Sequence, residues 1–220
     1  MGKLIVIEGL DGSGKSTQVT LAKERLEKSG VLAKLVSFPD YEDKSSTLVK
    51  MYLAGEFGDK PDSVNAYAAS LFYAVDRYAS FKRYWSEWYN GGGTVICGRY
   101  VESNAYHQMS KLPRSMWDGY LDWLYDLEYE KTGIPRPDLV IFLDMPVAVS
   151  TGMVESRYKG DESKKDIHEK DKEYLEKCRE AAKFAEEKCG WKVINCAENG
   201  KPRSIESISD EIISEIMKVL

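Results

Sequence analysis

A glycine-rich segment near the amino terminus limits the possible folds more than any other part of the chain. It reads G-x-x-x-x-G-K-S from Gly9 to Ser16, directly after an apolar stretch. Glycines let the backbone curl so that successive N–H groups point at phosphate oxygens, and the start of a following helix adds a partial positive charge. The segment therefore predicts a phosphate-binding loop between a strand and a helix. The alternative is a chance glycine-rich turn.

This loop carries specific expectations for a bound nucleotide. Lys15 is expected to reach the β and γ phosphates of ATP, and the Ser16 hydroxyl is expected to bind Mg²⁺. The residues expected to contact ATP are Gly9, Asp11, Gly12, Ser13, Gly14, Lys15, Ser16 and Thr17. GTP switches, motors and transport ATPases use such loops too. The chain lacks the Asn-Lys-x-Asp element of guanine switches, and its 220 residues are few for a motor, which favours a small-molecule kinase.

Apolar segments alternate with longer helical patterns along the chain. This order predicts an α/β fold in which helices cover both faces of a parallel sheet. The expected strands are residues 3–7, 32–37, 94–97, 139–143 and 192–195, and the clearest helical patterns are 63–90 and 204–220. Five strands fit one P-loop NTPase-like domain that spans residues 1–220.

Composition limits the kinds of molecule that the chain is expected to bind. The net charge of −5 argues against broad nucleic-acid binding, which needs a basic face. Apolar runs fall short of the ~20 residues of a membrane span, and the amino terminus resembles no secretory signal. The four cysteines lack CxxC spacing and there are two histidines, so a zinc site is not expected. We therefore expect a cytoplasmic protein without a membrane or nucleic-acid partner.

A charged segment, residues 156–172, is dense in Lys, Asp and Glu and contributes little apolar surface. Such a segment can close over a site as a lid. A solvated helix face is the commoner outcome for a charged run, so both interpretations stay open.

Short motifs distributed over nearly the whole chain suggest a family. They are E-G-L-D-G-S-G-K-S-T-Q from Glu8, F-P at Phe38, L-F-Y-A-V-D-R ending at Arg77, R-Y at Arg99 and L-D-M-P at Leu143. In order and spacing they resemble the thymidylate kinase family. The resemblance implies phosphorylation of dTMP to dTDP with ATP and Mg²⁺, and a homodimer formed through helices such as that in 63–90. Another nucleoside monophosphate or a nucleoside as acceptor, and a nucleotide-binding regulator without turnover, are the alternatives.

The resemblance also implies an acceptor site. Arg99 follows the third expected strand, at the edge where open parallel sheets bind ligands, and its guanidinium could hold the acceptor phosphate. Arg77 would read the thymine, Tyr73 would stack on it, and Asp11 would accept from the 3′-hydroxyl. The full expected set is Asp11, Phe38, Pro39, Tyr73, Arg77, Arg99, Ser103 and Gln108. Taken singly, an arginine more often forms a surface ion pair, and a tyrosine more often lies in the core.

The expected catalytic cations are Lys15, Arg99 and Arg157. Family members with glycine at the loop position of Gly12 resemble one another in supplying a cation from the lid, which favours Arg157 and then Lys159. Two further lid lysines are candidates, Lys164 and Lys165. The resemblance also places Glu169 near the metal and the acceptor, although a solvated glutamate is its alternative.

Two positions depart from the family pattern. Gly98 replaces an aspartate that helps to hold Mg²⁺, and Tyr41 replaces an arginine near the acceptor phosphate. The carboxylates that could compensate are those of Asp40, Glu8 and Asp144, and the cations are those of Lys44 and Lys50. These departures leave the acceptor's identity less defined than the kinase chemistry.

Overall fold

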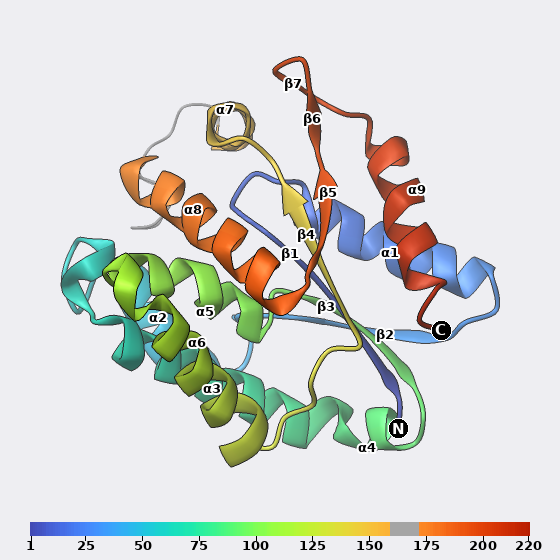
Figure 1. Cartoon of the computed structure of the whole chain (residues 1–220). Helices are drawn as coiled ribbons and strands as arrows, with labels where there is room; N and C mark the ends of the chain where they lie inside the picture. The colour runs from blue at the N-terminus through green and yellow to red at the C-terminus, as the bar shows by residue number, and fades with distance from the viewer. Residues whose placement is uncertain (159–171) are drawn as a thin grey trace.

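The computed structural model describes residues 1–158 and 172–220, and the side chains of 1–153 and 173–220. Its centre is a five-stranded parallel sheet in the order β2-β3-β1-β4-β5 (Figure 1). The strands are β1 Lys3–Gly9, β2 Ala33–Ser37, β3 Thr94–Gly98, β4 Leu139–Asp144 and β5 Lys192–Asn195. All five predicted strands are present, and the predicted α/β class is confirmed.

The central strand β1 is buried on both faces, and its side chains alternate between two cores. Ile5 and Ile7 pack with α1 (Lys15–Lys28) and α9 (Ile205–Ile216) on one face. Leu4 and Val6 pack with helices on the opposite face. Such apolar runs are typical of parallel strands covered on both sides. Figure 1 shows these two helical layers.

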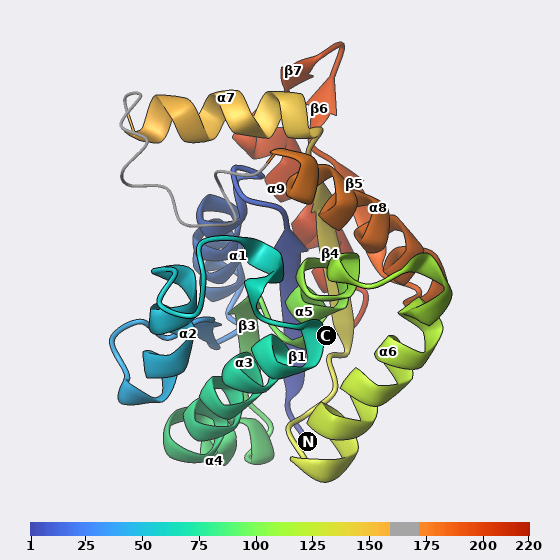
Figure 2. The same ribbon diagram turned by 90° about the vertical axis from the view of Figure 1, so that its left-hand side faces the viewer.

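The second helical layer comes mainly from the middle of the chain. Its α-helices are α3 Ala66–Ser80, α4 Ser86–Asn90, α5 Val101–His107, α6 Trp117–Tyr125 and α8 Lys172–Cys189. Two more helices are α2 Thr47–Leu53 and α7 Val147–Tyr158, which lie nearer the carboxyl edge of the sheet (Figure 2). None of the described helices combines the length and apolar character of a bilayer span.

Shorter elements connect these helices. The 3₁₀ turns are Lys44–Ser46, Pro61–Ser63, Met109–Lys111 and Arg114–Met116, and the π-helical segments are Phe81–Trp85 and Asp126–Lys131. A hairpin of β6 Ala197–Glu198 and β7 Lys201–Pro202 precedes α9.

The long helix expected over residues 63–90 is interrupted. α3 begins at Ala66, and the wider π-helical turn Phe81–Trp85 separates it from α4. This turn buries both Phe81 and Trp85, whose rings lie 4.6 Å apart. The turn thus places two large rings in the core, with the wider hydrogen-bond spacing of a π-helix in place of the α-helical one. The last helix is also shorter than expected, because α9 ends at Ile216.

Candidate active site

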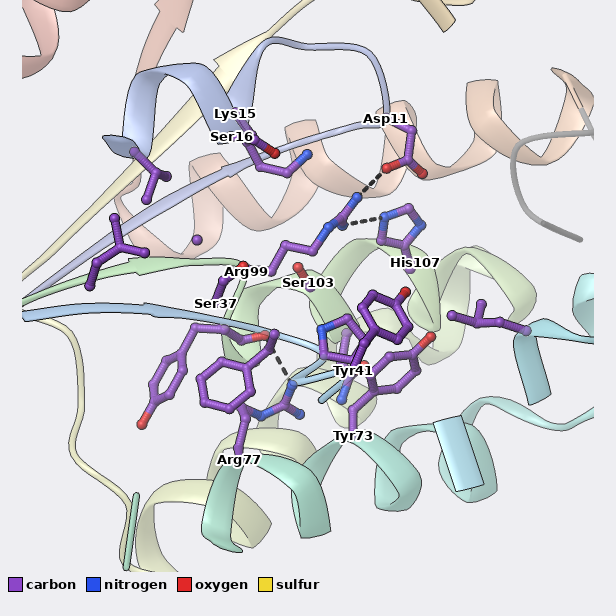
Figure 3. A pocket seen from close by; sticks show the side chains of 18 of the residues that line it. Asp11, Lys15, Ser16, Ser37, Tyr41, Tyr73, Arg77, Arg99, Ser103 and His107 are labelled. Atoms are coloured by element: carbon purple, nitrogen blue, oxygen red, sulfur yellow. Dashed lines mark hydrogen bonds and ion pairs between the residues drawn. The ribbon is translucent and has the colours of Figure 1, made fainter. Parts of the chain in front are cut away.

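A cavity of about 470 Å³ lies at the carboxyl ends of β1, β2 and β3 (Figure 3). All members of the expected acceptor set line it, and so do Lys15 and Ser16 of the phosphate loop. The other expected ATP contacts, Gly9, Gly12, Ser13, Gly14 and Thr17, belong to the loop and to the first turn of α1 without lining this cavity. Sequence motifs gave no role to several lining residues, among them Ser37, Leu53, Tyr100, Asn104 and His107.

The phosphate loop adopts a backbone that its glycines allow. Gly12 and Gly14 have φ angles of 77° and 85°, in the left-handed region that other residues rarely adopt. A Cβ on Gly9 would lie 2.7 Å from the Ser13 hydroxyl oxygen and 2.9 Å from the Leu143 carbonyl oxygen. Lys15 Nζ donates to the carbonyl oxygens of Gly9 (2.6 Å) and Leu10 (3.0 Å), so its ammonium group lies over the loop. This is where the phosphates of a nucleotide would bind.

Arg99 connects this loop to the rest of the cavity. Its Nη2 forms an ion pair with Asp11 Oδ1, and its Nη1 lies 3.1 Å from His107 Nε2 (Figure 3). Burial alone lowers the pKa of Arg99, but the Asp11 carboxylate raises it above its ordinary value, so the guanidinium stays charged. Arg99 has a φ angle of 62°, a strained conformation that is common at functional sites. The pair between Arg99 and Asp11 is therefore not the surface ion pair that the sequence left open, because both residues line the cavity.

Glu8 fixes the start of α5 against β1. Its buried carboxylate accepts hydrogen bonds from the Tyr100 N–H (2.7 Å), the Ser103 hydroxyl (2.7 Å) and the Tyr106 hydroxyl (2.8 Å). These bonds occupy both carboxylate oxygens. Ser103 therefore reaches the cavity while held by Glu8, and Glu8 is not placed to replace a metal-binding aspartate.

Arg77 reaches the cavity from α3. Its Nε donates to Glu128 Oε2 (3.2 Å), its Nη2 pairs with Glu128 Oε1, and its Nη1 donates to the Tyr100 carbonyl oxygen (3.2 Å). The surface ion pair that the sequence left open for a single arginine is wrong for Arg77, whose side chain is 1% exposed and pairs with buried Glu128. Asp76 accepts from the Asp40 N–H and the Ser45 hydroxyl. Glu128 was not identified from the sequence, since no motif marks it.

Gln108 offers polar atoms to a ligand. The residue is 0% exposed and lines the cavity, and neither its Oε1 nor its Nε2 has a hydrogen-bond partner among the described residues. A buried amide without partners costs stability, about 1–3 kcal/mol. A bound molecule with a donor and an acceptor would satisfy both atoms. Tyr73 lines the same cavity from α3 (Figure 3).

Several residues suggested as substitutes at the two divergent positions have other partners or lie outside the cavity. Asp144 forms a two-point ion pair with Arg179, with both N–O distances at 2.9 Å. Within residues 1–153 and 173–220, no three His, Cys, Asp or Glu side chains are grouped as a metal site. Lys50 Nζ donates to the Tyr41 carbonyl oxygen (3.1 Å), and neither Lys50 nor Lys44 lines the cavity. Tyr41 itself does line it.

Most of the charged segment 156–172 lies outside the described residues. Arg157 lies in α7, but its side chain is outside the described part of the chain. Four other candidates, Lys159, Lys164, Lys165 and Glu169, also lie outside the described residues.

A sheet in this order, a glycine-rich loop before α1 and a cavity lined by arginines define a P-loop phosphotransferase. A family model described as thymidylate kinase matches residues 7–212. The thymidylate kinase of Mycobacterium tuberculosis is 31% identical over 158 residues, 71% of each chain, and that of Schizosaccharomyces pombe is 35% identical over 160 residues, 71% of this chain and 69% of the relative. The chain therefore belongs to the thymidylate kinase family, nucleoside monophosphate kinases that use ATP.

A solved structure shows the same fold. Thymidylate kinase from Candida albicans superposes with a TM-score of 0.71 at 22% identity, and the match covers 99% of this chain and 92% of that one. The thymidylate kinase of Danio rerio is 26% identical over 97% of this chain and 92% of its own length. The similarity to these two thymidylate kinases thus extends over almost the whole chain, including the helices that line the cavity.

Proposed function

We propose that this enzyme transfers the γ-phosphoryl group of ATP to dTMP and releases dTDP and ADP. The observation that supports this most directly is the ion pair between Arg99 and Asp11, because it joins the acceptor cavity to the phosphate loop. A donor phosphate on the loop and an acceptor phosphate at Arg99 would then be neighbours. Transfer between anchored phosphates depends mainly on positioning and on electrostatic stabilisation.

The donor would bind through the loop from Gly9 to Thr17. Backbone N–H groups and Lys15 would hold the phosphates, and Ser16 would be the protein ligand of Mg²⁺. An exposed Ser16 hydroxyl fits this ion, since Mg²⁺ in such sites keeps several waters and binds the nucleotide's own phosphate oxygens. Bound Mg²⁺ would neutralise charge on the β and γ phosphates.

The acceptor would bind in the cavity itself. Arg99 would hold its phosphate, and Gln108 and Arg77 would face the thymine edge, which offers both donors and acceptors. Tyr73 would stack on the base. Asp11 would bind the 3′-hydroxyl, and the remaining contacts would come from Phe38, Pro39 and Ser103. A general base is not needed, because the acceptor phosphate is an anion near pH 7.

A third catalytic cation would come from Arg157. The loop carries Gly12 where other family members have arginine, so the loop itself supplies Lys15 as its cation. As the resemblance implies, we propose Arg157 as the cation that stabilises the transferring group, with Lys159 as the second candidate. Arg157→Ala should lower kcat far more than Lys159→Ala.

We also propose that the enzyme is a homodimer. Each chain would contribute a single domain, and the protein would be cytoplasmic. Leu71, Val75 and Tyr78 are 44%, 54% and 41% exposed on one side of α3. Spacing by four and three residues aligns them as an apolar stripe. A second copy of this chain would cover it. Val75→Glu should shift the sedimentation coefficient from that of a dimer to that of a monomer.

The function is tested by measuring ADP release with each common nucleoside monophosphate and with thymidine, at matched concentrations. We expect a clear preference for dTMP, lost in Lys15→Ala. A preference for another acceptor would overturn the choice of dTMP. ATP binding without turnover on any acceptor would instead support a regulator.

A further inference from the structure

His107 lines the cavity beside Arg99, although no sequence motif assigns it a role. It is the last residue of α5 and is 6% exposed. Its ring lies between those of Tyr106 and Tyr174, with centroid distances of 4.6 Å and 6.2 Å. The Tyr174 hydroxyl also donates to the His107 carbonyl oxygen at 2.7 Å. The imidazole is thus held in one orientation by α5 and α8.

The hydrogen bonds of this imidazole define where its proton lies. Nε2 is 3.1 Å from Nη1 of Arg99, and a guanidinium can only donate. Nε2 must therefore accept, and the neutral ring carries its proton on Nδ1. Nδ1 lies 3.6 Å from Cys178 Sγ, which can accept weakly. Burial raises the pKa of Cys178 to about 12, so this sulfur is a neutral thiol.

Among the described residues, Arg99 is the charged group nearest this ring, and it opposes a second proton there. The charges of Asp11 and then Lys111 also reach its neighbour Cys178, and burial lowers the pKa of Lys111, in the turn after α5, to about 7. Asp11 supplies negative charge on this side but is paired with Arg99. The hydroxyls of Tyr106 and Tyr174 stay neutral, because burial raises the pKa of both well above the ordinary value. A proton on Nε2 would remove an acceptor from Arg99 and place a cation against it.

These contacts leave one edge of Arg99 for a ligand. Asp11 engages Nη2, while His107 and, at 3.4 Å, the Tyr106 hydroxyl engage Nη1. Nε donates to none of the described residues. Nε and the second N–H of Nη2 can therefore bind two oxygens of one phosphate, the two-point geometry that arginine favours.

We propose that neutral His107 is a positioning residue that fixes the Arg99 guanidinium for the acceptor phosphate, and that protonation of His107 releases Arg99. The inference rests on the proposed role of Arg99 in holding the acceptor phosphate. It predicts that acidification weakens acceptor binding through His107, separately from the titration of the acceptor itself.

Two variants separate positioning from simple packing. His107→Gln keeps an oxygen that can accept from Arg99 but cannot titrate, whereas His107→Leu keeps neither property. At pH 8 we expect His107→Leu to raise KM for dTMP about tenfold or more, the effect of one hydrogen bond to a charged group, with little change in KM for ATP. His107→Gln should restore most of this loss.

The pH profile gives the decisive comparison. The ratio of kcat/KM for dTMP in His107→Gln to that in the wild type should rise as pH falls from 8 to 5.5, since only the wild type loses its acceptor. Titration of the dTMP phosphate cancels in this ratio. A ratio that stays flat, or an unchanged KM in His107→Leu, would overturn the proposal.

Two controls keep its failure distinct from failure of the proposed function. Arg99→Lys should raise KM for dTMP, and an unchanged KM would reject the proposed role of Arg99. If Arg99→Lys raises KM but His107→Leu does not, only the role of His107 is rejected. The nitrogen NMR shifts of the ligand-free protein report the tautomer without any activity. The chain has two histidines, so the His107→Gln spectrum identifies the signal. A neutral ring protonated on Nε2 would also reject the proposal.

Discussion

The guanidinium of Arg77 and the carboxylate of Glu128 form a two-point ion pair whose side chains are 1% and 0% exposed. Arg77 comes from α3, and Glu128 comes from the π-helical segment after α6. Burial alone would lower the pKa of Arg77, but Glu128 raises it above its ordinary value, so the pair is ionic. Two helices on one side of the cavity are therefore joined at a residue proposed to read the base.

Removing Glu128 should destabilise the fold strongly, because it would leave the charge of Arg77 buried without a partner. We expect Glu128→Ala to lower the free energy of unfolding by about 3–5 kcal/mol in urea denaturation. Glu130→Ala is the matched control, since Glu130 pairs with Arg136 at the surface and should cost less than about 1 kcal/mol. Equal effects of the two substitutions would contradict the importance of burial.

Replacing both Arg77 and Glu128 tests whether the stability lost in Glu128→Ala comes from the unpaired charge. Apolar residues of similar volume often replace a buried ion pair without loss of stability. Arg77→Met combined with Glu128→Leu should therefore unfold at higher urea than Glu128→Ala alone. If Arg77 reads the base, the double variant should still raise KM for dTMP. A stable double variant with unchanged KM would remove Arg77 from the acceptor site.

Lys15→Ala should abolish most turnover and leave the fold intact. Its ammonium group donates to carbonyl oxygens of the loop and lies where transferring phosphates would develop charge. A well-aimed cation at such a place contributes a factor of about 10³ or more to the rate. Lys23→Ala, in the same helix, removes a surface pair with Glu27 and should change kcat little. Similar kcat values in the two variants would contradict the donor site.

Glu102 should make stability depend on pH. Its carboxylate is 2% exposed, and burial raises its pKa to about 7 although Oε1 accepts from the Tyr129 hydroxyl at 2.7 Å. The folded state therefore holds a proton that the unfolded state loses above its ordinary pKa of 4.5. Stability contributed by this proton is present below pH 4.5 and is lost as pH rises to 7, by up to about 1.4 kcal/mol per unit.

The substitution Glu102→Gln removes this titration. The free energy of unfolding of the variant minus that of the wild type should increase between pH 4.5 and 7, and should then level off. Urea denaturation at several pH values measures the difference. Parallel stability curves for the two proteins would show that Glu102 titrates alike in the folded and unfolded states.

Local sequence was enough to predict the strands and the phosphate loop. Both depend on neighbouring residues: apolar runs for β1 and β3, and glycines with Lys15 and Ser16 for the loop. The interruption of the helix at Phe81–Trp85 was not predicted. Trp85 of this turn is buried against Tyr100, a contact between distant residues that local spacing does not show.

Partners distant in the sequence could not be predicted. Arg77 and Glu128 are 51 residues apart, and Asp11 and Arg99 are 88 apart. The resemblance indicated that both arginines face the acceptor, but no periodicity shows which carboxylate each one meets. Asp144 illustrates the same point: its place after an apolar strand suggested a metal ligand, whereas Arg179 of α8 occupies both its oxygens.

Gly98, at the end of β3, offers a direct test of the divergent metal site. A Cβ there would lie 3.3 Å from Val19 Cγ2 and 3.4 Å from the Ser37 hydroxyl oxygen, so small side-chain shifts would admit it. Gly98→Asp should therefore fold, with a loss of about 1–2 kcal/mol. Because Mg²⁺ binds carboxylates readily, the variant should reach half-maximal rate at several-fold lower Mg²⁺. Gly98→Ala adds the same Cβ without the carboxylate and should leave the Mg²⁺ dependence unchanged; an equal shift in both variants would assign the effect to shape rather than charge.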